Sequence, residues 1–171
     1  MTTEHWRLTT VFLSLGSNLG DRRANLDAAA SRLKDAGLRI SALSPLYEAE
    51  AVGVVQQPDF LNQVIQAETS LSPFALFRLL KQVELAMGRP LLAFGAPRII
   101  DIDLLLYGGL RVVALDLLVP HPRMWARKFV LLPLLDLGVD PVSPSGRKAS
   151  QLLQKPDVAG QKCRVVGVTR L

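Results

Sequence analysis

Two aspartates stand one residue apart in RIIDIDLLLYG (98–108), otherwise the most apolar strand-like segment of the chain. Residues two apart on a strand project from the same face, with their Cα atoms about 6 to 7 Å apart. We therefore expect Asp101 and Asp103 to point the same way, while Ile102 anchors the opposite face. Carboxylates this close repel unless a cation or hydrogen-bond donors compensate them, and such hard oxygen ligands suit Mg²⁺. The alternative is an exposed sheet face with two solvated aspartates.

Basic residues near the pair favour the magnesium alternative. Arg98 ends a glycine-containing loop directly before the aspartates, and Arg89 follows the end of an expected helix. Because a guanidinium meets phosphate oxygens through two parallel hydrogen bonds, this combination is typical of a magnesium-nucleotide site for phosphoryl transfer. His121, which stands between two prolines, would donate to phosphate or cap a turn, and the sequence leaves both open.

A second group of residues suits a flat heterocyclic ligand. Phe60 and Asn62 share one face of an expected strand in DFLNQVIQAETS, and Phe129 follows Arg127 in HPRMWARKF. Two aromatic rings can sandwich a planar ligand, and an asparagine amide offers a donor and an acceptor to its edge. Taken alone, phenylalanines at such positions are more often core residues.

Other familiar site patterns are missing from the sequence. GSNLGD (16–21) suggests an anion-binding loop before a helix, but it has neither the P-loop nor the GxGxxG pattern. No GxSxG elbow occurs, and two histidines are too few for a histidine-rich metal site. The single Cys163 cannot form an internal disulfide.

Composition bounds the partners and the organisation. The 171 residues, 49% of them hydrophobic, fit one domain (1–171) with a core at about 8–140 and an extension at 141–171. No window has the roughly 18 apolar residues of a membrane span and no signal peptide is evident, so we expect a cytoplasmic protein without a membrane partner. A net charge of +5 favours a polyanionic ligand, but scattered basic residues and 6% aromatics argue against nucleic acid. We expect a monomer that binds a small phosphorylated ligand.

The expected elements follow the order strand, helix, strand, strand, helix, strand. Their segments are 10–15, 21–36, 39–48, 59–70, 72–87 and 99–107, and Pro45 places the second strand at an edge or across a bulge. Gly108 and Gly109 predict a hairpin into 110–115; helix-like residues and a last strand follow at 123–137 and 162–171. The order predicts an α+β fold of the ferredoxin-like split βαβ type, a sandwich of helices on one face of an antiparallel sheet, with an extra C-terminal hairpin and helices.

Taken together, these motifs resemble the 6-hydroxymethyl-7,8-dihydropterin pyrophosphokinases of folate biosynthesis. The resemblance runs from about Val11 to Pro141, through LSLGSNLGD, SPLYEAEAVG, QPDFLN, ELAMGR, APRIIDIDLLLYG, VPHPRM and RKFVLLPL. QPDFLN and PRxxDxDxLxY are its most specific elements. It implies transfer of the β,γ-diphosphate of ATP to the hydroxymethyl group of the pterin, with release of AMP.

The resemblance also implies a role for each matching residue. Asp101 and Asp103 would bind two Mg²⁺ ions and form the catalytic set with Arg89 and Arg98. The implied ATP-binding residues are Glu84, Arg89, Arg98, His121 and Arg127. The implied pterin-binding residues are Gly16, Val52, Phe60, Asn62 and Phe129.

The sequence departs from the family pattern in two places. PLLAFGA, between Arg89 and Arg98, is uncharged where the family usually has further basic residues, and Ala49 and Ala51 stand where Thr and Pro are common. The first departure keeps an alternative open, a non-catalytic homologue that binds pterin or nucleotide.

Overall fold

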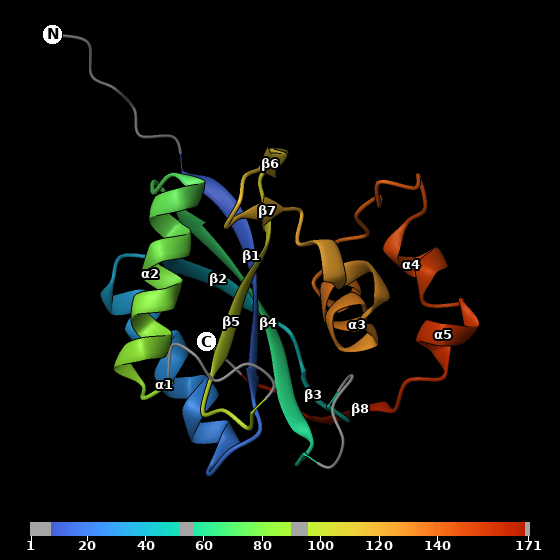
Figure 1. Cartoon of the computed structure of the whole chain (residues 1–171), viewed down its shortest axis with the longest axis horizontal. Coiled ribbons are helices and arrows are strands. Elements are labelled where there is room, and N and C mark those ends of the chain that lie inside the picture. Colours follow the sequence, from blue (N-terminus) through green and yellow to red (C-terminus); the bar gives the residue numbers. More distant parts are fainter. Residues whose placement is uncertain (1–7, 52–56, 90–95, 170–171) are drawn as a thin grey trace, which may run out of the picture.

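The computed structural model describes residues 8–51, 57–89 and 96–169 of the 171-residue chain (Figure 1). Within them, one antiparallel sheet has the strand order β5-β1-β4-β3-β8, and β2 also pairs with β4. The bounds of these strands are β1 Thr9–Ser17, β2 Arg39–Leu43, β3 Leu46–Ala49, β4 Phe60–Thr69, β5 Asp101–Tyr107 and β8 Cys163–Gly167. The helices are α1 Arg22–Asp35, α2 Pro73–Ala86, η1 Pro122–Ala126, α3 Lys128–Asp136, α4 Ala149–Leu152 and α5 Pro156–Ala159. The order confirms the predicted ferredoxin-like α+β fold.

Side-chain caps set the starts of the two helices between the strands. The Asp21 carboxylate accepts a hydrogen bond from the N–H of Ala24 at 3.0 Å, and α1 begins at Arg22, directly after Asp21. The Ser72 hydroxyl accepts from Ala75 N–H at 3.3 Å, and Pro73 is the first residue of α2. Both caps satisfy N–H groups that have no partner inside the helix. The start of α2 at Pro73 agrees with the expected helical segment 72–87.

The sheet has an apolar layer on each face. Alternate residues of β1 separate the layers: Leu13 and Leu15 pack with α1 and α2, whereas Phe12 packs with Val130 and Leu134 of α3. The prediction of helices on one face holds for α1 and α2, but α3 lies across the opposite face (Figure 1). None of the helices in the described part of the chain is long and apolar enough to span a membrane.

Two strand predictions differ from the structure: the hairpin after Gly108 and the continuous strand through Pro45. The chain turns after β5 at Gly108, but the next strand, β6 (Val112–Val113), pairs with β7 (Leu118–Val119). The predicted hairpin between 99–107 and 110–115 is therefore wrong. The predicted 39–48 strand is divided at Pro45 into β2 and β3, and a bulge lies within β2. Pro45 supplies no backbone N–H for a continuous ladder.

The C-terminal segment adds to the sheet and to the layer over α3. Strand β8 pairs with β3, so Ala49 lies opposite Cys163 and Glu48 lies opposite Arg164. Helices α4 and α5 pack against α3 through a small buried cluster that includes Leu131. The C-terminal segment therefore contacts strand β3 and helix α3, the two elements that flank the candidate active site.

Candidate active site

The aspartate pair lies on edge strand β5 with the predicted alternation. Asp101 and Asp103 are 26% and 23% exposed at the side chain, whereas Ile102 between them is fully buried in the layer under α1 and α2. In the register with β1, Asp101 lies opposite Gly16 and Asp103 opposite Ser14. All four residues line one pocket, so the two carboxylates open into a shared space.

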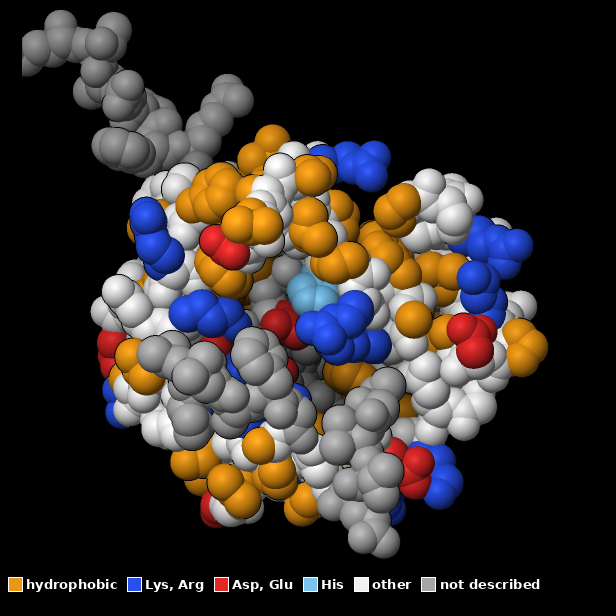
Figure 2. All heavy atoms as spheres, viewed as in Figure 1, with side chains coloured by type: hydrophobic (Ala, Val, Ile, Leu, Met, Phe, Trp, Pro, Cys, Tyr) orange, Lys and Arg blue, Asp and Glu red, His pale blue; other side chains and the backbone are white. Residues whose placement is uncertain are grey.

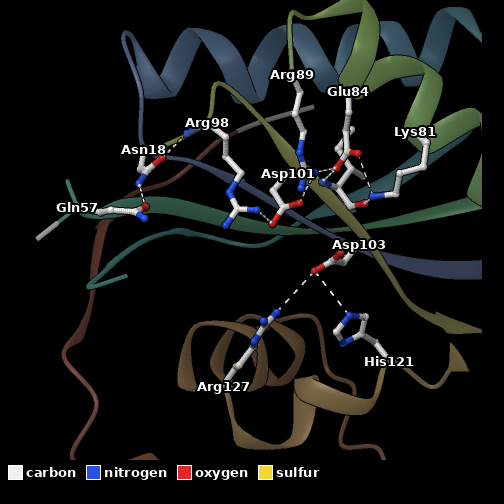
Figure 3. A network of polar contacts seen from close by, with 11 residues as sticks. Asn18, Gln57, Lys81, Glu84, Arg89, Arg98, Asp101, Asp103, His121 and Arg127 are labelled. Carbon is white, nitrogen blue, oxygen red and sulfur yellow. Dashed lines mark hydrogen bonds and ion pairs between the residues drawn. The ribbon is translucent and has the colours of Figure 1, made fainter. Parts of the chain in front are cut away.

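Basic side chains from three separate segments converge on these carboxylates (Figure 3). Arg89 Nη1 lies 2.5 Å from Asp101 Oδ1, and Arg98 Nη1 lies 3.5 Å from the other oxygen of the same carboxylate. Asp103 Oδ2 faces Arg127 Nη1 at 3.6 Å and the His121 imidazole at 3.8 Å. The structure thus brings together the predicted pair and its predicted basic partners.

The surroundings shift the pKa values of these groups. Burial alone would raise the pKa of Asp101, but Arg89 and Arg98 hold it below its usual value, so this carboxyl is ionised at neutral pH. Burial lowers the pKa of His121 even though Asp103 opposes the shift. His121 is therefore neutral at neutral pH and meets the site as an imidazole with one N–H donor.

Glu84 lies beneath the site, where only 3% of the residue is exposed. Its Oε1 accepts from the Ile102 N–H at 2.6 Å and lies 2.5 Å from Arg89 Nη1, so one oxygen holds both β5 and the arginine. Lys81 Nζ donates to Glu84 Oε2 at 2.9 Å and to the Ile102 carbonyl at 3.2 Å. The role of Glu84 in ATP binding stays a prediction. Because Glu84 holds the Arg89 side chain, it would act on a bound ligand through that arginine.

Sequence reasoning did not single out Lys81 or Asn18. Asn18, 2% exposed, accepts from Arg98 N–H at 2.8 Å, and its own backbone N–H donates to the Arg98 carbonyl at 3.1 Å. Its side-chain amide donates to Gln57 Oε1 and to the Pro58 carbonyl, both at 3.1 Å. The polar residue inside GSNLGD was the available signal for Asn18, and the three-residue spacing from Glu84 was the signal for Lys81.

Aromatic residues form the other part of the pocket, whose space of about 610 Å³ includes open solvent. Phe60 and Phe129 line it, with the Arg98 guanidinium 5.5 Å from the Phe60 ring centre and the Arg127 guanidinium 5.6 Å from that of Phe129. These distances suit cation–π contacts. The two arginines therefore lie between the rings and the carboxylates.

Asn62 and Gly16 shape the floor of this pocket. Asn62 is 3% exposed, and its amide nitrogen donates to the Phe60 carbonyl at 3.3 Å. A Cβ atom on Gly16 would lie 3.0 Å from Asn62 Oδ1, so any larger residue there would press on that oxygen. The structure brings Gly16, Phe60, Asn62 and Phe129 together as predicted; Val52 and the uncharged residues 90–95 lie outside the described residues.

A second hollow of about 570 Å³ adjoins the first at Asp103. Its walls are mainly apolar, with Phe77 of α2 and Leu117 before β7, and His121 lies at its edge. Figure 2 shows the histidine and an acidic side chain beside it in a depressed part of the surface, with basic side chains at its rim. Asp103 thus lies between a hollow with aromatic and polar walls and a mainly apolar one, whereas Asp101 lines only the first.

The donor set fits Mg²⁺ if a ligand completes it. Two carboxylates share one face of β5, yet no group of three or more metal-binding side chains occurs in the described part of the chain. Mg²⁺ usually takes one or two carboxylates and fills its remaining positions with water and phosphate oxygens. Asp101 and Asp103 are therefore the residues that would hold it.

Fold and site define a class before any particular family, namely ferredoxin-like α+β proteins with an acidic and arginine-rich ligand pocket. The fold is shared with solved HPPK-DHPS structures. "HPPK-DHPS A437G with SDX-DHP" from Plasmodium falciparum has a TM-score of 0.70 at 16% identity, over 90% of this chain and 46% of that one. "HPPK-DHPS in complex with substrates" has a TM-score of 0.63 at 14% identity, over 85% and 43% of the two chains.

Sequence comparison gives the particular family. The model of 7,8-dihydro-6-hydroxymethylpterin-pyrophosphokinase (HPPK) matches residues 12–139, and the chain belongs to this family. The "2-amino-4-hydroxy-6-hydroxymethyldihydropteridine pyrophosphokinase" of Pseudomonas aeruginosa is 38% identical over 94% of this chain and 96% of its own length. Its Bacillus subtilis namesake is 39% identical over 74% of this chain and 76% of its own. An Arabidopsis thaliana "Folate synthesis bifunctional protein" is 44% identical, but the chain spans only 26% of it.

Proposed function

We propose that this chain transfers the β,γ-diphosphate of ATP to 6-hydroxymethyl-7,8-dihydropterin in a Mg²⁺-dependent reaction, giving the pterin diphosphate and AMP. Membership of the pyrophosphokinase family supports the reaction class. The observation that carries the proposal is a single pocket lined by Asp101 and Asp103 as well as by Phe60, Asn62 and Phe129. An enzyme that transfers diphosphate needs both groups of residues in one pocket, because its planar acceptor and its polyphosphate donor must meet.

The pterin is proposed to lie between Phe60 and Phe129. Ring stacking suits a planar bicyclic ligand, and the Asn62 amide offers a donor and an acceptor to its edge. Asn62 is almost fully buried, so a ligand without matching polar groups would leave the amide poorly satisfied. Recognition would thus combine stacking area with polar discrimination.

The phosphates are proposed to lie over Asp101 and Asp103. Mg²⁺, when bound to these carboxylates, would neutralise phosphate charge and make the β-phosphorus more susceptible to attack; two ions are part of the proposal. Among the described residues, Arg98 Nε is buried without a hydrogen-bond partner, which suits an incoming phosphate acceptor. A neutral His121 would contribute an N–H donor to the phosphate chain without adding charge.

The adenosine part of ATP is proposed to occupy the second hollow. This hollow shares Asp103 with the pterin pocket, and its apolar walls, including Phe77 and Leu117, suit a nucleobase. ATP would then run from the second hollow across the carboxylates, with its β-phosphorus toward the pterin.

The reaction needs no covalent intermediate on the protein. The hydroxymethyl oxygen of the pterin would form a bond to the β-phosphorus as the bond from that phosphorus to the α,β-bridging oxygen breaks. AMP leaves with that oxygen, and the hydroxyl proton is released to solvent. Arg98 and Arg127 lie between the aromatic rings and the carboxylates, so they can orient the phosphates and offset developing negative charge. Catalysis would come mainly from positioning and electrostatics.

The experiment is AMP release from ATP by purified protein, with pterin and Mg²⁺ each omitted in turn, beside pterin binding measured without metal. The proposal predicts AMP only when both are present. Pterin binding without AMP would instead favour the non-catalytic homologue. A monomeric state, a single domain over 1–171 and a cytoplasmic location remain predictions, which light scattering, limited proteolysis and cell fractionation test separately.

A further inference from the structure

Gln161 lies outside the matched segment 12–139, yet its side chain bonds to the backbone on both sides of Arg127. Its Oε1 accepts from Lys128 N–H at 3.0 Å, and its Nε2 donates to the Ala126 carbonyl at 2.8 Å. A single amide therefore brackets the residue whose guanidinium faces Asp103.

The local backbone needs such a partner. Arg127 separates η1 from α3, has an extended conformation (φ −119°, ψ 105°) and gives α3 no side-chain cap. The first N–H groups of a helix lack partners within it, and at Lys128 the partner is Gln161. The Arg127 carbonyl in turn accepts from the N–H groups of Val130 and Leu131, both at 3.0 Å. The start of α3 is thus held both by the Gln161 side chain and by the hydrogen bonds to the Arg127 carbonyl.

Gln161 is itself held by its neighbours. Its Nε2 also donates to the Asp157 carbonyl at 3.1 Å, and Lys128 Nζ donates to the carbonyls of Ala159 at 2.8 Å and Gln161 at 3.3 Å. These bonds join α5 to the start of α3. The amide is therefore oriented before any ligand arrives, as a partner of a precise site must be.

From Gln161 the chain continues directly to a second part of the pocket wall. Lys162 Nζ lies 2.6 Å from Glu50 Oε1, and Cys163 pairs with Ala49 on β3. Glu50 lines the pocket, as do Arg127 and Phe129. Residues 161–163 therefore connect the wall formed by α3 with the wall that follows β3.

We propose that Gln161 is a positioning residue for diphosphate transfer, which sets Arg127 toward Asp103 and Phe129 toward the pterin. The inference rests on the proposed function, since it gives Gln161 a part in that reaction. It also assigns a role to the C-terminal extension. Strand β8 and the Gln161 side chain would hold the pterin pocket, although both lie outside the segment that the family model matches.

The test compares Gln161→Met with Gln151→Met. Methionine keeps the approximate size of glutamine and removes its hydrogen bonds. Gln151 is a matched control because its Oε1 also accepts a backbone N–H at a helix start, that of Lys148 at 2.9 Å. Lys148 and its chain neighbours do not line the pocket, whereas Gln161 bonds to the residues on both sides of Arg127, which does. Gln151→Met should lose stability of the order expected for one helix cap. Gln161→Met should lose more, because its side chain also donates to the carbonyls of Ala126 and Asp157.

Only Gln161→Met is expected to alter the reaction parameters. Its pterin KM should rise roughly three- to tenfold and its kcat should fall roughly tenfold, as for other partners of site residues. Amide exchange at Lys128, Val130 and Leu131 should accelerate in the same variant. A merely structural role would reduce the amount of active protein and leave the pterin KM unchanged.

Each outcome separates the two proposals. Equal pterin KM and kcat in the two variants, with an active wild type, would overturn the role of Gln161 while the proposed function stands. Unchanged exchange at Lys128 in Gln161→Met would overturn the geometry on which it rests. A wild type that releases no AMP would refute the proposed function and, with it, a part for Gln161 in that reaction, even if exchange at Lys128 accelerates in Gln161→Met.

Discussion

Replacing Asp101 with asparagine should separate stability from activity. The carboxylate faces Arg89 at 2.5 Å and Arg98 at 3.5 Å, so the change removes a charge-assisted pair from a site that is 26% exposed. The amide oxygen can still accept from Arg89, Glu84 still compensates that arginine, and repulsion with Asp103 disappears. We therefore expect the free energy of unfolding to fall by only about 1 kcal/mol.

The same change should affect turnover far more. Loss of a hard anionic ligand is expected to lower kcat at least about 100-fold, equivalent to about 2.7 kcal/mol in the activation barrier, and to raise the Mg²⁺ concentration needed for half-maximal rate. The assay is AMP release over a Mg²⁺ series, paired with urea unfolding. Asp27→Asn is the control, because within the described part of the chain Asp27 makes only an exposed pair with Arg23 at 3.5 Å. Near-normal Mg²⁺-dependent turnover in Asp101→Asn would refute the metal assignment.

Three further predictions concern the two sides of the site and its pH dependence. Phe129→Ala should weaken pterin binding about tenfold in a fluorescence titration, since a stacked ring contributes about 1 kcal/mol beyond its buried area; unchanged affinity would contradict stacking. Glu84→Gln should lower the free energy of unfolding by about 1–3 kcal/mol, because Arg89 and Lys81 lose their buried counter-charge; an equally stable variant would argue against that network. Because the folded-state pKa of Asp101 is lowered, its contribution to stability is complete above the unfolded pKa and is lost as pH falls through the folded value. Below about pH 4, wild-type stability should therefore fall more steeply than that of Asp101→Asn in urea unfolding, and parallel curves would contradict the shift.

Local patterns predicted much of the frame of the site. The alternation around Ile102 indicated that Asp101 and Asp103 share a face, and the structure places them so because a strand has no other way to arrange such neighbours. The cap at Ser72 likewise acts within three residues. Features that depend on a few neighbouring residues were therefore available in the sequence.

Features that depend on distant partners were not available in local patterns. Gly108 correctly marked a turn, but a two-residue strand carries too little pattern to choose its partner, and β6 pairs with β7. The spacing of Lys81 from Glu84 was visible in the sequence, but the bond from Lys81 to the Ile102 carbonyl depends on β5 lying beside α2. Gln161 reaches backbone groups 33 and 35 residues away, so no spacing rule identifies it.

The most direct test of the account follows the phosphorus atoms of ATP. The protein would be incubated with Mg²⁺, 6-hydroxymethyl-7,8-dihydropterin and ATP labelled at the β-phosphate, and the products separated. The account predicts that the label moves to the pterin and that AMP appears unlabelled in equal amount. Label retained in ADP, or in unchanged ATP, would contradict diphosphate transfer at this site.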